Sequence, residues 1–410
     1  MKSWKWVVFC AFLVGLTFVA VGQQGAVAQQ QARANVVEGV DSAVYMPGPY
    51  EVVPNWPQPL HPDGSLTWGR FADVFAESPN RVYAFQTGEY PPSWRSGKDP
   101  KNPEWPQRSP AVSATYCAMP GYTCTPGQGD MMDTATKKPI PGSKWEHLLL
   151  VLDANGKLIE SWEQHNHLFT HPHGVLMDPK DPERHVWLLD DGSEQIFKFT
   201  HDGKKLVMTL GEFRVKGNDK THLGGPNGIA FLPNGDFYVS DGYKNSRVVK
   251  FSKDGKYLME WGTPGTGPGQ FHTTHSVGIG PDGRLYVGDR GNLRDQIFDQ
   301  NGKYLSEIRD IYPNALGISK DQQSMWVAQG GTAVTVSHLW KYDLNGKLLS
   351  SWSRPFGVQP DQLWGIHGFS TDSDGNVYVA LSVGGRVVKY RPKKGADPKL
   401  LIGQLAKNSF

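Results

Sequence analysis

Six copies of one hairpin pattern constrain this chain more than any other feature of its sequence. Each copy has two alternating strands around an Asn-Gly, Asp-Gly or Lys-Gly turn, which is a strong hairpin signal. The copies read LLLVLDANGKLIESW, IFKFTHDGKKLVMTLG, VVKFSKDGKYLMEWG, IFDQNGKYLSEI, LWKYDLNGKLLSSW and VVKYRPKKGADPKLLIG. A second series of strand pairs precedes them, and its weakest copy is FADVFAESPNRVYAFQTG near residues 71–88.

Together, one pair from each series makes a four-stranded unit that cannot bury both of its faces alone. Such units pack radially, so the sequence predicts an all-β fold, a six-bladed β-propeller over residues 69–410. The proline-rich stretch 29–68 is expected to wrap the propeller as an N-terminal strap. Propellers close on themselves, which favours a monomer.

A long insertion, about residues 89–145, separates the inner pair of blade 1 from its outer hairpin. Long segments without a period are usually lids or binding loops. We therefore expect a lid, with a structural flap as the alternative. The insertion contains CAMPGYTC, whose Cys117 and Cys124 are predicted to form a disulfide in an oxidising compartment. A metal or redox pair is the alternative, although no histidine stands close by in the sequence.

Residues 1–28 have the pattern of a signal peptide. Lys2 and Lys5 precede an apolar run over 7–21, and Ala-Val-Ala at 26–28 offers a cleavage site before Gln29. An uncleaved anchor is the alternative, but the run is shorter than the ~20 residues that a span needs. The predicted location is secreted or periplasmic, with no membrane span after cleavage. Lysine plus arginine total 42 against 40 acids, which argues against a nucleic-acid partner.

Three histidines occupy the same position in alternate copies of the inner-strand motif. His173 begins HGVLMD, His275 begins HSVGIG and His367 begins HGFSTD, while Asn227 and Asn314 hold the position between them. Alternate blades would bring the three imidazoles together on the axis. Three imidazoles with an open fourth position are the arrangement that catalytic zinc uses, although copper, iron or nickel would also accept them.

Two alternatives remain for these histidines. They can be structural side chains with satisfied hydrogen bonds. A rival metal site can also be drawn from the local cluster of His165, His167 and His171 in HNHLFTHPH.

The segment SDGYKNSRVVKFSKDGKYLMEWG, followed by PGQF and then HSVGIG…LYVGDR, resembles the peptidyl-α-hydroxyglycine α-amidating lyases. These are NHL-type six-bladed propellers, and the resemblance runs from about Leu168 onward. It implies cleavage of a C-terminal α-hydroxyglycine to a peptide amide and glyoxylate. It also implies a catalytic zinc held by His173, His275 and His367.

The resemblance further assigns two catalytic residues. The family's tyrosine, the proposed base for the hydroxyl, matches Tyr243 in SDGYKNSR, and one of its two active-site arginines matches Arg290 in VGDR. Neighbouring positive charge would lower the pKa of the phenol, and an arginine can hold a carboxylate bidentately. The alternatives are a rim tyrosine that packs a loop, and an ion pair of Arg290 with Asp241 or Asp289.

This sequence departs from the family pattern at three positions. The family's other arginine falls on Thr87 in FQTG, which alters the substrate side. Thr87, Asn227 and Asn314 are the candidate substrate-binding residues. An aspartate that helps bind a structural calcium is replaced by Gly368, so that Ca²⁺ is doubtful. A methionine two positions before the third histidine is replaced by Gly365.

Three functions are therefore open. The first is a secreted zinc lyase acting on an α-hydroxyglycine peptide or another small N-acyl carbinolamide. The second is a metal-dependent propeller enzyme of other chemistry, such as a lactonase, hydrolase or sugar lyase, because a divalent metal polarises carbonyls equally well there. The third is a non-catalytic NHL propeller that binds a protein or glycan.

Overall fold

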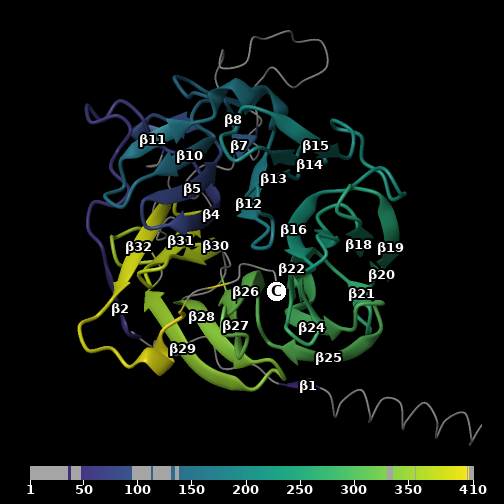
Figure 1. Cartoon of the computed structure of the whole chain (residues 1–410). Helices are drawn as coiled ribbons and strands as arrows, with labels where there is room; N and C mark the ends of the chain where they lie inside the picture. The colour runs from purple at the N-terminus through teal and green to yellow at the C-terminus, as the bar shows by residue number, and fades with distance from the viewer. Residues whose placement is uncertain are drawn as a thin grey trace, which may run out of the picture.

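Six sheets, each built on four antiparallel strands, stand around a common axis in the computed structural model (Figure 1). The structure describes residues 48–94, 138–329, 336–355, 357–403 and 405, with short strands at 36–37, 112–113 and 131–133. The predicted signal peptide, Cys117, Cys124 and most of the insertion lie outside the described residues. The six-bladed β-propeller prediction is confirmed.

Each blade runs from an innermost strand at the axis to an outermost strand at the perimeter. Blade 1 holds β4 (Phe71–Ser78), β5 (Arg81–Gln86), β10 (Leu149–Leu152) and β11 (Leu158–Ser161), and blade 2 holds β12 (Pro172–Met177), β13 (Val186–Asp190), β14 (Gln195–Phe199) and β15 (Leu206–Leu210). Blade 3 holds β16 (Pro226–Phe231), β17 (Phe237–Asp241), β18 (Arg247–Phe251) and β19 (Tyr257–Trp261), and blade 4 holds β22 (Thr274–Ile279), β23 (Leu285–Asp289), β24 (Arg294–Phe298) and β25 (Tyr304–Arg309). Blade 5 holds β26 (Pro313–Ile318), β27 (Ser324–Gln329), β28 (Val336–Asp343) and β29 (Leu348–Pro355), and blade 6 holds β30 (Ile366–Thr371), β31 (Val377–Leu381), β32 (Arg386–Pro392) and β2 (Tyr50–Val52).

Shorter elements decorate the blades. They are β1 (Val36–Val37), β3 (Thr67–Trp68), β6 (Glu89–Tyr90), β7 (Val112–Ser113), β8 (Met131–Asp133), β9 (Lys138–Ile140), β20 (Thr263–Pro264), β21 (Gln270–Phe271) and the 3₁₀ helices η1 (Pro92–Trp94), η3 (Glu163–Leu168), η4 (Arg290–Asn292) and η5 (Pro398–Leu400). Strands β7, β8 and β9 form a small sheet within the insertion. No helix of the described residues is long and apolar enough to cross a bilayer.

The prediction for the sixth outer hairpin is wrong in its second strand. Strand β32 pairs with β2 from the N-terminal strap, so residues from the two ends of the chain share one blade. After β32 the chain turns instead into η5, where the Asp397 side chain accepts the Lys399 N–H. The outer edge of β32 is already paired with β2, so the residues after β32 have no free edge to join.

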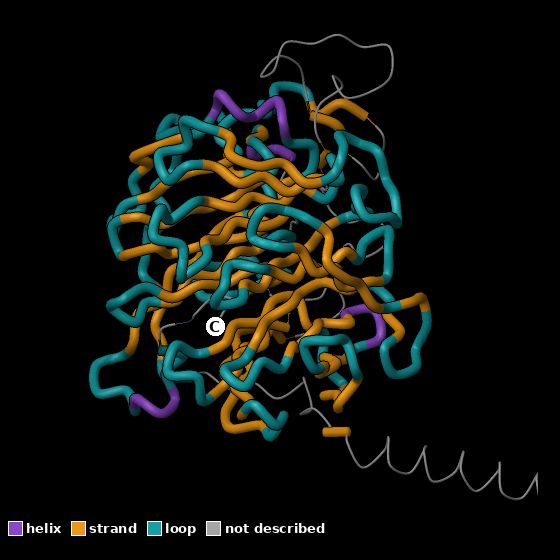
Figure 2. The backbone as a smooth tube through the Cα atoms, turned by 45° about the vertical axis from the view of Figure 1, so that its right-hand side comes forward, coloured by secondary structure: helices purple, strands orange, loops and turns teal. Residues whose placement is uncertain are grey.

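The sheets bury apolar side chains between neighbouring blades, and their outermost strands are more exposed. Figure 2 shows the strands of the blades joined by loops and turns. Between blades 2 and 3, for example, Trp187 packs against Phe231 and Phe237, with ring centroids 5.3 and 5.0 Å away. Strand β16 is buried throughout, whereas the outermost strand β19 alternates between half-buried and exposed residues. One face of an outermost strand meets water, so exposed residues fall at every second position of β19, namely Leu258 and Glu260.

A β-bulge interrupts the innermost strand of every blade at the same place. The pairing register shifts around one residue in each strand, namely Ala72, His173, Asn227, His275, Asn314 and His367. A bulge leaves its extra residue outside the ladder and re-aims its side chain. The repeated bulge therefore turns six side chains, one per blade, toward the axis near one rim.

Candidate metal centre and substrate pocket

The three histidines of the alternate blades meet on the axis. The ring centroids of His173, His275 and His367 lie 4.7–5.0 Å from one another. One ligand atom from each lies within 4.8 Å of the other two. His173 and His275 are buried, with 3% and 2% of their surface exposed. The predicted convergence of the imidazoles is thus observed.

The blades without a histidine orient these rings. His275 donates its Nδ1–H to the Asn314 carbonyl, and His367 donates its Nδ1–H to the Ala72 carbonyl, both at 2.7 Å. His173 faces the Asn227 backbone in the same way, but its Nδ1 makes no well-aligned hydrogen bond. A proton held on Nδ1 leaves the Nε2 lone pair free to bind a metal.

Burial keeps the three imidazoles neutral. It is the largest cause that lowers the pKa of His173 and His275 well below the ordinary value, and it lowers that of His367 to about 3. The positive charge of Arg290 lowers all three further. Metal ligands must be deprotonated, so three buried neutral imidazoles aimed at one point fit a divalent ion.

Tyr243 lies directly against this cluster, in the turn after β17. Its hydroxyl is 3.0 Å from His275 Nε2 and 3.3 Å from His173 Nε2. Burial raises the pKa of the phenol, and the opposing effect of Arg290 does not reverse this. Arg290 lowers this pKa, as a neighbouring cation is expected to do, but desolvation outweighs the guanidinium charge and the net direction is upward.

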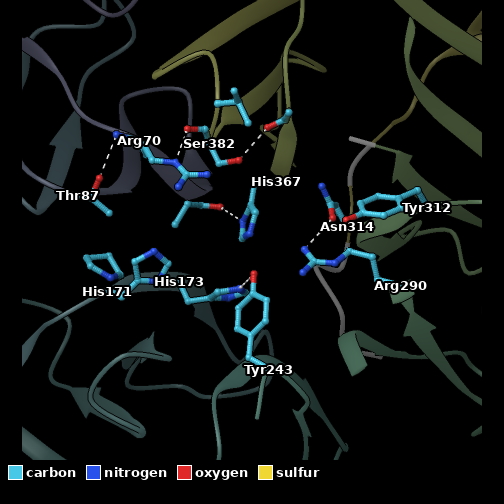
Figure 3. Close-up of a pocket in the computed structure, with 14 residues that line it drawn as sticks. Arg70, Thr87, His171, His173, Tyr243, Arg290, Tyr312, Asn314, His367 and Ser382 are labelled. Atoms are coloured by element: carbon cyan, nitrogen blue, oxygen red, sulfur yellow. Dashed lines mark hydrogen bonds between the residues drawn. The ribbon is translucent and has the colours of Figure 1, made fainter. Parts of the chain in front are cut away.

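Two guanidinium groups face each other across the pocket above the histidines (Figure 3). Arg290 lies over the rings of Tyr243 and Tyr312, at 5.2 and 5.6 Å, and donates to the Asn314 side-chain oxygen at 3.1 Å. Neither Asp241 nor Asp289 pairs with Arg290. Asp241 forms an ion pair with Arg247, and Asp289 forms one with Arg294. The ion-pair alternative for Arg290 is not what the described residues form.

Arg70 supplies the second guanidinium, and sequence reasoning missed it. It precedes β4 and donates through Nε to the Ser382 carbonyl at 2.8 Å. Arg70 and Thr87 pair across the strands, because the Arg70 N–H donates to the Thr87 hydroxyl and the Thr87 N–H donates to the Arg70 carbonyl. The family's arginine, which this sequence replaces with Thr87, is thus matched by Arg70, just before β4. The sequence did offer one signal for Arg70: Gly69-Arg70 begins the predicted hairpin that ends in FQTG, so Arg70 lies opposite Thr87.

The pocket has a volume of about 200 Å³ and contains most of the predicted substrate residues. Thr87, Tyr243, Arg290 and Asn314 line it, as does Gly365. Asn227 does not; its side chain accepts the Gly242 N–H and lines a smaller cavity of about 40 Å³ on the other side of the histidines.

His171 is a further lining residue, which sequence reasoning placed in a rival cluster. Its Nδ1 lies 2.6 Å from Asp191 Oδ1. Burial opposes protonation, but the charge and hydrogen bond of Asp191 outweigh it and raise the pKa of His171. The other two members turn elsewhere: His165 bonds the Gly203 carbonyl and His167 is exposed. Among the described residues, the one group of three or more metal-ligating side chains is the axial triad.

Fold and site together define the class of protein: a six-bladed β-propeller whose axis carries three imidazoles beneath a cationic pocket. The NHL repeat family matches residues 223–251, and the SMP-30/gluconolactonase/LRE-like family matches residues 276–402. Peptidyl-alpha-hydroxyglycine alpha-amidating lyase 1 of Drosophila melanogaster is 32% identical over 283 residues, which covers 62% of this chain and 51% of that protein. NHL repeat-containing protein 3 of Homo sapiens is 32% identical over 260 residues, which covers 58% of this chain and 69% of that protein.

The chain belongs to the NHL-repeat family, as the match to NHL repeat-containing protein 3 shows, and the resemblance to the amidating lyases seen in the sequence is confirmed. Peptidyl-glycine alpha-amidating monooxygenase B of Xenopus laevis is 30% identical over 266 residues. This match covers 61% of the present chain and 29% of the frog protein, so the chain spans less than a third of that relative.

Proposed function

We propose that this protein is a metal-dependent lyase that cleaves an N-acyl carbinolamide bearing a carboxylate, of the α-hydroxyglycine type, to an amide and glyoxylate. One observation carries the proposal. Three metal-ready imidazoles, the Tyr243 hydroxyl and two guanidinium groups line or flank the same pocket. The similarity to the Drosophila lyase supports it.

The two arginines select the substrate class. A carboxylate bound between Arg70 and Arg290 would receive charge-assisted hydrogen bonds, which are roughly twice as strong as neutral ones. No acidic side chain lines the pocket among the described residues, so a bound anion meets only cations and neutral groups there. The substrate hydroxyl, on the carbon next to this carboxylate, would then lie beside Tyr243 and the histidines.

His173, His275 and His367 would hold the divalent ion, which when bound supplies Lewis-acid activation of the substrate hydroxyl and lowers the pKa of nearby acidic groups. With the ion and Arg290 beside it, Tyr243 would ionise, and the tyrosinate would accept the hydroxyl proton. As the proton leaves, the O–H electron pair forms the C=O bond of glyoxylate and the C–N bond breaks. The released nitrogen takes a proton, which Tyr243 can return, so the amide and glyoxylate together balance the substrate.

The test uses purified protein beginning at Gln29, loaded with Zn²⁺ and given an N-acyl-α-hydroxyglycine. We expect glyoxylate from the wild type and none from His275→Ala, which should also lose its metal while keeping its fold. His272→Ala is the matched control, because His272 is an exposed histidine that lies three residues earlier, just before β22. Full metal content in His275→Ala would contradict the ligand assignment.

A second candidate is a lactone hydrolase, which the match of residues 276–402 to the gluconolactonase-like family favours. Protein that holds one zinc and hydrolyses a lactone, but releases no glyoxylate, would establish this candidate instead. Protein that binds no metal would leave a binding propeller. We further propose that the protein acts outside the cytoplasm, on the basis of its N-terminal sequence; cleavage of residues 1–28 during export tests this.

A further inference from the structure

A single carboxylate reaches the cavity on the far side of the histidine triad. Among the described residues that line this cavity of about 40 Å³, Asp73 is the one acidic residue, and all three histidines line it as well. Asp73 directly follows Ala72, which holds the bulge position of blade 1. Blade 1 contributes no histidine, but it stands between the blades that carry His173 and His367.

The Asp73 carboxylate contacts both neighbouring blades. On one side, Oδ2 accepts the Val175 N–H at 3.1 Å, two residues after His173 in β12. On the other side, it lies against Gly368, the residue after His367. A Cβ atom at Gly368 would lie 2.0 Å from Asp73 Oδ1, so only glycine leaves room for the carboxylate.

We infer that Asp73 is the positioning and charge-balancing residue of the three-histidine centre. This inference rests on the proposed metal site. Three neutral imidazoles give a divalent ion no negative charge, and bringing that ion into a largely buried site is costly unless it is compensated. A carboxylate behind the ligands supplies one negative charge, and its bond to the Val175 N–H ties that charge to the strand that carries His173.

Gly368 gives an independent handle on the same contact. Substituting alanine there leaves every charge in place but pushes on the Asp73 carboxylate from blade 6. Gly174 is the matched control, since it follows His173 as Gly368 follows His367. Its added Cβ would first meet the flexible Leu189 side chain, at 3.3 Å.

The experiment measures Zn²⁺ affinity of the mature protein by competition with a chromophoric chelator, beside thermal unfolding of the metal-free protein. Outer-shell partners of metal ligands are typically worth 10–100-fold in affinity, so Asp73→Asn should bind zinc at least about 10-fold more weakly. The asparagine oxygen can replace only one of the two carboxylate oxygens, which accept the Val74 N–H at 2.8 Å and the Val175 N–H at 3.1 Å, so the thermal unfolding of the metal-free variant checks that its fold survives. Gly368→Ala should weaken zinc binding in the same direction, and Gly174→Ala should stay within about twofold of the wild type.

The double variant Asp73→Gly/Gly368→Asp separates charge from packing, because it brings a carboxylate into the same space from the opposite strand. Recovery of affinity above that of Asp73→Asn supports the inference. Wild-type affinity in a folded Asp73→Asn, or equal affinities in Gly368→Ala and Gly174→Ala, would overturn it. Wild-type protein that binds no zinc refutes the proposed function itself, whereas zinc binding without glyoxylate release leaves the role of Asp73 testable.

Discussion

Replacing Asp295 with asparagine should make the protein more stable relative to the wild type as the pH rises. Asp295 lies in β24 and is completely buried, and neither of its carboxylate oxygens has a hydrogen-bond partner among the described residues. Burial, and after it the charge of Asp289, raises the pKa of Asp295 to about 7. An ionised carboxylate without partners is costly in such a place.

The sign and the size follow from the two ionisation states. In the unfolded chain the Asp295 carboxyl ionises near pH 3.8, whereas in the folded protein it ionises near pH 7. Below about pH 4 the Asp295 carboxyl is protonated in both the folded and the unfolded protein, so its ionisation costs the wild type no unfolding free energy there. Between about pH 4 and 7 the unfolded state releases its proton first, so the wild type loses about 1.4 kcal/mol of unfolding free energy per pH unit, on the order of 4 kcal/mol in total. Asparagine carries no such dependence.

The assay is urea unfolding followed by tryptophan fluorescence, at several pH values between 4.5 and 8.5. The difference between variant and wild type cancels the other titrating groups and should grow in favour of Asp295→Asn up to about pH 7. By calorimetry the full effect corresponds to roughly 6 °C for a propeller of about 340 residues. Asp374→Asn, on an exposed turn, controls for the loss of one carboxylate. A difference that stays constant with pH would show that Asp295 ionises alike in both states and would refute the reasoning.

Three further predictions concern the site. Tyr243→Phe should keep its zinc but lose about 10²–10⁴-fold in glyoxylate release, the usual range for a general base; unchanged turnover would remove Tyr243 from the mechanism. Arg70→Gln should raise KM for the carboxylate substrate about 10–100-fold at unchanged zinc content, because a hydrogen bond to a charged group is worth about 1.5–3 kcal/mol. Adding Thr87→Arg to this variant should recover part of the lost affinity. An equal KM would exclude Arg70 from binding. Removing zinc with a chelator should lower the thermal midpoint of unfolding, because an ion at 100 times its Kd stabilises the folded state by about 2.7 kcal/mol when it binds that state alone. An unchanged midpoint in protein that had held zinc would show that the ion does not bind the folded state selectively.

The sequence predicted those site residues that stand at the same position of a repeated strand motif. The histidines at 173, 275 and 367 were found because each opens the same motif, spaced about two blades apart. Arg70 was missed because its partners are distant in sequence: Thr87 lies 17 residues away and Ser382 lies 312 away. The raised pKa of Tyr243 was missed for a related reason, since desolvation depends on every segment that packs around the ring.

The sequence by itself determined the number of blades, the strands that form them except the outermost strand of blade 6, and the residues at five of the six bulge positions. These are local properties, because turn chemistry and a two-residue period act between neighbours in the chain. Only the tertiary structure decided that the strap supplies the outermost strand of blade 6, that carbonyls of Ala72 and Asn314 orient the histidines of the preceding blades, and that Asp73 lies against Gly368. Those contacts join segments on different blades, so they depend on how the sheets pack around the axis, which no local pattern encodes.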